Sequence, residues 1–188
     1  MKILVIAQHI FPMQTPRAHR ATELAKELSR LGHEVTVYAV LGKYRYNDFE
    51  KEYNLKVKNI PIRFQFKPYS SDGFEKRTFI DKVTGRLFGK LFEFPNIEFL
   101  FNLPGLIKKE KKHDLLISIA DPHHIHWGCA RAKLKYPDNF PKKWIADCGD
   151  PFFINTNRNE YHYGYYSKFE KIPLQIIDSY DDDAHLQE

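Results

Sequence analysis

The most constraining feature of the sequence is a strand–helix–strand pattern within its first forty residues. Residues 3–7 form a continuous apolar run, which is typical of a parallel strand covered on both faces. A helix is predicted over residues 16–31, because Thr15 suits a cap, a proline follows it, and apolar residues recur at helical spacing. Gly32 suits the end of this helix, and a second apolar strand follows over 35–40. Such a βαβ unit favours an α/β fold.

The alternation continues beyond this unit. Apolar runs predict strands near 55–62, 115–120 and 144–146. Helical spacing predicts a helix over 79–92, a weak helical stretch over 167–178, and a helix started by Asp121 and Pro122 whose stripe is Ile125, Cys129, Ala132 and Leu134. We therefore expect one doubly wound, Rossmann-like α/β domain with a mostly parallel sheet over residues 1–177. The acidic tail, residues 178–188, is expected to be disordered.

Length and composition limit the class of protein. The 188 residues suit one domain, and no stretch approaches the ~20 continuous apolar residues that span a bilayer. Two cysteines, too few for a disulfide framework, indicate a reducing cytoplasm. The net charge is +5 and would be +10 without the acidic tail, which favours an anionic partner such as a phosphate or an anionic membrane face.

The loop after the first strand, residues 8–17, argues against the most familiar ligands of this fold. Dinucleotide binding needs glycines there so that the backbone can approach a pyrophosphate, and this loop has none. The Walker pattern is absent too, so nicotinamide, flavin and P-loop nucleotide binding are disfavoured. The helix start can still bind a phosphate or an acceptor, with Arg17 and Arg20 one turn apart. The alternative is that both arginines lie on a solvated helix face.

Three histidines follow the strand at 115–120. His123 and His126 have a spacing that a metal site can use, but no nearby carboxylate or cysteine completes a ligand set, so no metal is predicted. Histidines in a first helical turn are expected to face solvent or make a local bond. We take His126 as a candidate ligand contact at this strand exit and assign no role to His123 or His124.

Two aspartates leave the last predicted strand, at Asp147 and Asp150. Their spacing differs from that of the paired aspartates that hold a divalent ion in many sugar transferases. Asp150 precedes a proline, which biases it to an extended backbone, and its carboxylate either accepts a hydrogen bond from a sugar hydroxyl or caps local N–H groups. For Asp147 we favour the structural interpretation.

Several segments together resemble the N-terminal domain of family 4 glycosyltransferases, which have the GT-B fold. The first are "MKILVIAQHIFP" and "RAHRATELAKELSRLGHEVTVYAV". The others are "FPNIEFLFNLPGLIKKEKK", "HDLLISIADPHHIHWGCARAKLK" and "KKWIADCGDPFF", the last similar to a subgroup with a W-I-A-D-x-x-D-P-W motif. The resemblance covers residues 1–153.

This resemblance implies a retaining sugar transferase that uses a nucleotide-sugar co-substrate without a metal or other cofactor. It implies that Asp150 acts in catalysis and that Arg17, Arg20, His126 and Asp150 contact a glycan or lipid-linked acceptor. It also implies a role in bacterial cell-surface polysaccharide synthesis.

The sequence departs from the family in three places: "MQTPR" replaces paired glycines in the first loop, Phe152 replaces a tryptophan, and no donor motif follows Pro151. We therefore expect a domain of a longer enzyme or a truncated gene product, inactive without a donor-domain partner.

Two further expectations concern partners. The basic, aromatic segment 74–112 suits docking at the inner face of the membrane, or else it is a core-packing helix with a solvated face. No nucleic-acid motif is present. The alternative function is a non-catalytic α/β module that binds a glycan or a protein.

Overall fold

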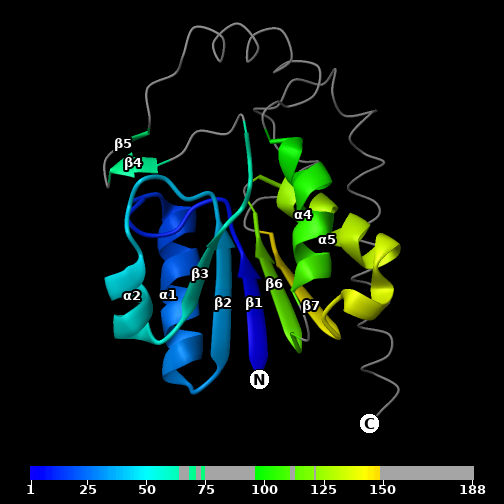
Figure 1. Ribbon diagram of the computed structural model, residues 1–188, viewed down its shortest axis with the longest axis horizontal. Helices are drawn as coiled ribbons and strands as arrows, with labels where there is room; N and C mark the ends of the chain where they lie inside the picture. The colour runs from blue at the N-terminus through cyan, green and yellow to red at the C-terminus, as the bar shows by residue number, and fades with distance from the viewer. Residues whose placement is uncertain (64–67, 71–72, 75–95, 111–112, 121, 149–188) are drawn as a thin grey trace, which may run out of the picture.

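The structure, a computed structural model, describes residues 1–63, 68–70, 73–74, 96–110, 113–120 and 122–148. Several predictions fall outside the described residues: the helices over 79–92 and 167–178, Asp121, Asp150 and the acidic tail. The described part contains the sheet and the helices that cover it (Figure 1).

Five parallel strands form the main sheet, in the order β3-β2-β1-β6-β7. They are β1 (Lys2–Ile6), β2 (Glu34–Ala39), β3 (Lys56–Asn59), β6 (Leu115–Ile119) and β7 (Lys143–Asp147). From central β1 the chain runs outward through β2 to β3, and it then returns to the other side of β1 for β6 and β7. This reversal is the switch point of a doubly wound fold, so the predicted Rossmann-like α/β class is confirmed.

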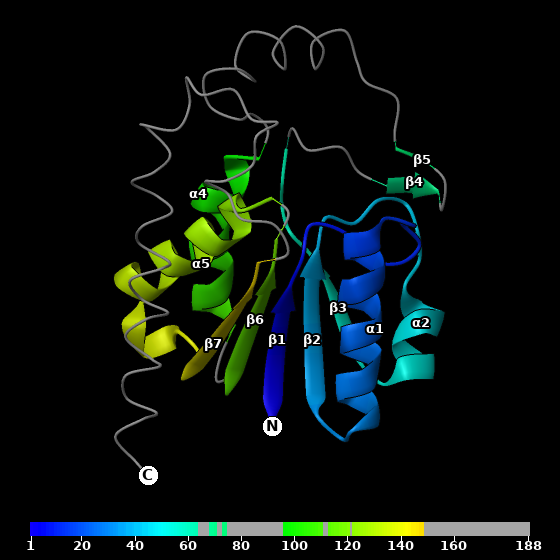
Figure 2. The same ribbon diagram turned by 180° about the vertical axis from the view of Figure 1, so that it is seen from behind.

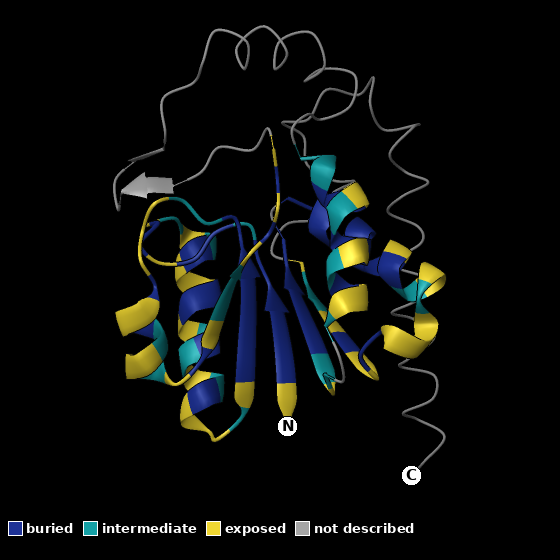
Figure 3. Ribbon diagram, viewed as in Figure 1, coloured by how far each residue is buried: buried dark blue, intermediate teal, exposed yellow. Residues whose placement is uncertain are grey.

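Helices cover both faces of the sheet (Figure 2). On one face lie α1 (Pro16–Arg30) and α2 (Asn47–Tyr53), and on the other lie α4 (Glu98–Lys109) and α5 (His124–Lys135), which is followed by the short 3₁₀ helix η1 (Pro137–Asn139). In β1, Ile3 and Val5 pack with α1, whereas Leu4 and Ile6 pack with α4 and α5. Because both faces are covered, the central strands are buried along most of their length (Figure 3).

The first helix begins and ends as its sequence predicts. The Thr15 side chain accepts a hydrogen bond from the Ala18 N–H at 3.2 Å, and Pro16 occupies the first helical position. Leu31 is the C-cap, and Gly32 follows with φ +85°, a conformation that side-chain-bearing residues rarely adopt.

Helices α4 and α5 pack against each other at unusually short range around Gly128. A Cβ atom at this position would lie 2.6 Å from the Phe99 carbonyl oxygen and 2.9 Å from the Leu103 side chain. Both of these α4 residues are fully buried. The contact between the two helices therefore depends on the absence of a side chain at residue 128.

Helix α5 differs from its prediction at both ends. It begins at His124, with His123 in the capping position and no side-chain cap, two residues after the predicted start. Leu134, predicted on the apolar stripe, is 63% exposed. The buried stripe is set by Ile125, Cys129 and Ala132, and a residue five positions after Cys129 points away from that face.

Four short elements were not predicted: α2, η1, β4 (Pro68–Ser70) and β5 (Gly73–Phe74), the last two paired antiparallel. Helix α4 lies within the segment 74–112, for which a core-packing helix was one of two interpretations, but its bounds were not predicted. Helix α2 has only seven residues, and Phe49 is the one it buries, so it carries no apolar periodicity. In the described part of the chain, none of the helices has the length and apolar character needed to cross a membrane.

Candidate functional site

The carboxyl ends of β1, β6 and β7 lie on one edge of the sheet, where open parallel sheets bind ligands. Helix α1 reaches across to the last strand there, because Arg20 Nη1 lies 3.1 Å from Asp147 Oδ1. The exits of β6 and β7 are joined as well, since the Ala120 N–H donates to the Asp147 carbonyl at 3.1 Å. Segments distant in the sequence thus meet at this edge, which we call the rim.

Of the predicted site residues, Arg20 lies at this rim, Arg17 lies one helical turn away, and Asp150 lies outside the described residues. Arg20 contacts Asp147 while its side chain stays 53% exposed, so the guanidinium can still bind an anion or a sugar hydroxyl. The contact agrees with the structural interpretation of Asp147. Arg17, one turn earlier on α1, is partly buried. Asp150 lies outside the described residues, so its catalytic role stays a prediction.

His126 is buried in the layer between α5 and the sheet. It is 2% exposed, and its Nδ1 lies 2.8 Å from the Ser118 hydroxyl of β6. The same hydroxyl accepts a hydrogen bond from Trp144 Nε1 of β7, also at 2.8 Å. A serine that accepts from an indole N–H retains its own hydrogen to donate to the imidazole. We call these three residues the Ser118 network.

The Ser118 network ties α5, β6 and β7 together just below the rim. This geometry favours a positioning role for His126, and its contact with an acceptor stays a prediction. Cys129 adjoins the network. Burial raises the pKa of its thiol, and a hydrogen bond with Ser118 lowers that pKa by a smaller amount. The thiol is therefore a packing group rather than a nucleophile.

The prediction that the α5 histidines face solvent is wrong, and the alternative of a local bond stays a prediction for His123 and His124. His123 and His124 are 4% and 0% exposed, and the His124 ring lies 4.2 Å from that of Trp127. His123 is the N-cap of α5 and His124 its first residue, and both are buried at this end of the helix. Within the described ranges, no group of three or more histidine, cysteine, aspartate or glutamate side chains is placed to hold a metal ion.

Sequence reasoning also missed His9, in the loop that leaves β1. Burial lowers its pKa from 6.5 to about 4, against the opposing effect of a hydrogen bond with the Val40 backbone. The loop is fixed beside β2, because the Val40 N–H donates to the Gln8 carbonyl at 2.9 Å. A single histidine after an apolar strand has no periodicity, so the sequence carried no signal of its burial.

His9 gives a testable dependence of stability on pH. The unfolded chain binds a proton at His9 as the pH falls through 6.5, whereas the folded chain resists until about pH 4. Stability is therefore complete above pH 6.5 and falls between these values, by about 3 kcal/mol in total from this group. The unfolding free energy, measured by urea denaturation at several pH values, should change less steeply with pH between 4 and 6.5 in the His9→Gln variant than in the wild type. Above pH 7 its dependence on pH should match that of the wild type. Equal slopes below pH 6.5 would contradict the assignment.

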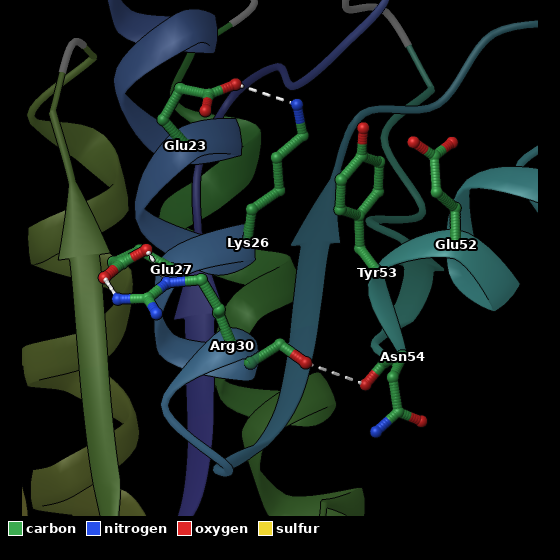
Figure 4. Close-up of a pocket in the computed structure, with 8 residues that line it drawn as sticks. Glu23, Lys26, Glu27, Arg30, Glu52, Tyr53 and Asn54 are labelled. Atoms are coloured by element: carbon green, nitrogen blue, oxygen red, sulfur yellow. Dashed lines mark hydrogen bonds and ion pairs between the residues drawn. The ribbon is translucent and has the colours of Figure 1, made fainter.

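The structure also shows a hollow of about 700 Å³ between α1 and α2, away from the rim (Figure 4). Its lining includes Glu23, Lys26, Arg30 and Tyr53. The Lys26 ammonium donates to Glu23 at 2.8 Å and lies 4.5 Å from the Tyr53 ring centre. Arg30 is paired with Glu27. Glu52 adds a third carboxylate to the lining, so the hollow has a small excess of negative charge and does not suit an anionic ligand.

Comparisons with known proteins add little to this geometry. No protein-family model matches the chain, and no curated protein matches it significantly. Among solved structures it is similar to two crystal structures of the C-terminal domain of a hydrogenase from Pyrococcus furiosus. Both are 12% identical, with TM-scores of 0.41 and 0.39, and the matches cover 78% and 77% of this chain and 90% and 89% of theirs. Similarity this low supports no argument about function.

Proposed function

We propose that this chain is the acceptor-side domain of a retaining sugar transferase, and that it binds a glycan or lipid-linked acceptor in bacterial cell-surface polysaccharide synthesis. The observation that carries the proposal is the Arg20–Asp147 contact at 3.1 Å. It brings the start of α1 to the exit of β7, three residues before Asp150 in the sequence. A basic group and a carboxylate-bearing segment at one edge of a parallel sheet suit a phosphate-linked sugar.

In this proposal each group has a distinct task. Arg17 and Arg20 bind the phosphate of a lipid-linked acceptor, helped by the N-terminal end of α1. Asp150 accepts a hydrogen bond from the acceptor hydroxyl that takes the sugar. The Ser118 network holds the exits of β6 and β7 together at the rim. The glycine-free loop after β1 supports an acceptor in place of a dinucleotide.

Sugar transfer also needs a nucleotide-sugar site, which the proposal assigns to a second domain or a separate chain. The chain by itself is then expected to bind an acceptor without transferring sugar to it. We further propose that it works in the cytoplasm, at the inner face of the membrane, where a lipid-linked acceptor lies. Co-sedimentation with anionic vesicles at low salt checks this location, because the attraction between charges is screened by salt.

Acceptor binding can be measured by calorimetry with a short-chain isoprenyl diphosphate that carries one sugar. The Arg17→Gln and Arg20→Gln variants should each bind about tenfold or more weakly, because each loses a charge-assisted hydrogen bond to phosphate. Arg30→Gln is the matched control, since Arg30 is an exposed arginine at the opposite end of the same helix.

Three outcomes decide the proposal. Weakening at Arg17 and Arg20 with no effect at Arg30 supports it. No binding by the wild-type chain, or an equal loss in all three variants, contradicts it. If the chain binds glycans but neither a second domain nor a partner found by pull-down supplies a donor site, the chain is a non-catalytic binding module instead.

A further inference from the structure

A ladder of aromatic rings runs from the loop after β1 to helix α2. The Phe11 ring stacks on that of Phe49, with centres 5.7 Å apart and planes 7° apart. The Tyr44 ring stands perpendicular to Phe11, with centres 5.4 Å apart, and contacts Tyr46 at 4.9 Å. Two of these rings are well exposed, Phe11 at 39% and Tyr44 at 38%. We call this exposed, perpendicular pair the aromatic corner.

The aromatic corner is held in place from below. The Tyr46 hydroxyl donates to the Phe11 carbonyl at 2.6 Å, and the Phe11 N–H donates to the Thr22 hydroxyl of α1 at 2.8 Å. Tyr46 and Phe49, the rings beneath, are buried. The backbone of Phe11 is thus fixed on both sides, and its ring is ordered before any ligand arrives. A pre-ordered surface loses little conformational entropy on binding.

Position and charge indicate what the aromatic corner binds. Phe11 follows β1 and Tyr44 follows β2, so both lie in loops at the carboxyl edge of the sheet, and these loops run side by side in Figures 1 and 2. Tyr44 is flanked in the sequence by Lys43 and Arg45, and all three are exposed. An aromatic face with two neighbouring cations therefore lies on the same edge as the rim.

We propose that the aromatic corner binds an acidic sugar ring of a glycan. The C–H face of a pyranose carries partial positive charge and stacks on the negative face of an aromatic ring. Lys43 and Arg45 supply the charge that pairs with a sugar carboxylate or a phosphate substituent. The inference rests on the proposed function, because it names the acceptor of that function as a negatively charged glycan.

Two other ligands share part of this chemistry. Single-stranded nucleic acid also stacks on rings beside cations, but it uses a row of rings along a groove, whereas here two rings meet at a right angle. An anionic membrane also attracts aromatic and basic residues, but it needs side chains that extend freely into the interface, whereas Phe11 is fixed against α1 and Phe49. The rigid perpendicular pair favours a sugar ring.

The test uses the 188-residue chain and four probes: an alginate hexasaccharide, neutral maltohexaose, a thymidine dodecamer and vesicles with an anionic lipid. We expect alginate to bind most tightly and the Tyr44→Ala variant to weaken that binding about tenfold. Tyr44→Phe keeps the ring and should bind as the wild type does. Phe101→Ala is the matched control, because Phe101 is 61% exposed on α4 with the Arg131 guanidinium 5.0 Å from its ring.

The outcomes separate this inference from the proposed function. If Tyr44→Ala does not fold, the Lys43→Gln/Arg45→Gln variant replaces it and should lose alginate binding while keeping the ring. Alginate binding that is absent, or unchanged in these variants, overturns the inference, and so does Tyr44-dependent binding of the dodecamer or the vesicles alone. The isoprenyl diphosphate measurement with Arg17→Gln and Arg20→Gln is independent of Tyr44, so the proposed function can hold when the aromatic corner fails.

Discussion

Replacing Gly128 by alanine is expected to destabilise the protein by about 1–3 kcal/mol, although alanine favours an isolated helix by about 1 kcal/mol. The added Cβ would lie 2.6 Å from the Phe99 carbonyl oxygen, a backbone atom that cannot turn aside. Helix α4 would have to move away from α5, and both helices belong to the same core cluster. A larger side chain such as valine should be worse, because the Cβ already meets Leu103 and the added branches need still more space there.

The chain offers a matched control within α4. Gly105 is exposed, and a Cβ added there meets no atom within 4 Å. Gly105→Ala should therefore stabilise the protein by roughly 0.5–1 kcal/mol through helix propensity alone. Urea denaturation followed by circular dichroism would measure both variants. The change in unfolding free energy should have opposite signs for the two alanine variants. A Gly128→Ala variant as stable as the wild type would contradict the close contact.

Removing the Ser118 hydroxyl is expected to have a comparable effect. Ser118→Ala takes away the acceptor of the Trp144 N–H and the partner of His126 Nδ1, both at 2.8 Å in a buried layer. Each buried polar group that loses its partner costs about 1–3 kcal/mol, so for the two groups we expect a loss of about 2–6 kcal/mol. The measurement is the free energy of unfolding in urea, followed by tryptophan fluorescence.

Ser29→Ala is the control for this experiment. Ser29 also donates a hydrogen bond, to the Asn54 carbonyl at 3.0 Å, but it lies at the edge of the hollow, where water can replace it. We expect a change of less than about 1 kcal/mol there, partly offset by the better helix propensity of alanine. Equal losses of unfolding free energy in the two variants would contradict a special contribution of the Ser118 network to stability.

Much of the fold could be predicted because local signals agreed with the tertiary structure. The apolar run of β1 is buried on both faces, and Thr15, Pro16 and Gly32 start and end α1 where their conformational preferences predict. Helix α2 was not predicted because a seven-residue helix with one buried side chain has no apolar periodicity to detect. The predicted start of α5 lies two residues before the observed one, because an Asp-Pro pair is a common helix start.

The site was harder to predict than the fold. Arg20 and Asp147 could be assigned to one edge of the sheet because the strands were expected to be parallel, but their contact depends on the length and direction of one side chain. His126 was expected to be accessible because a polar residue near a helix start is usually solvated, and its pairing with Ser118 could not be foreseen from spacing. The ring contacts of Phe11 and Tyr44 join loops that no sequence pattern connects.

The central position of β1 also affects how this chain is made. One edge of β1 pairs with β2, which is synthesised soon afterwards, but the other edge waits for β6, which begins at residue 115. Until then the backbone N–H and C=O groups of that edge, and the apolar side chains of Leu4 and Ile6, lack their native cover. A ribosome-bound chain that ends before β6 therefore exposes an unpaired strand edge, which can pair with another chain until β6 is synthesised.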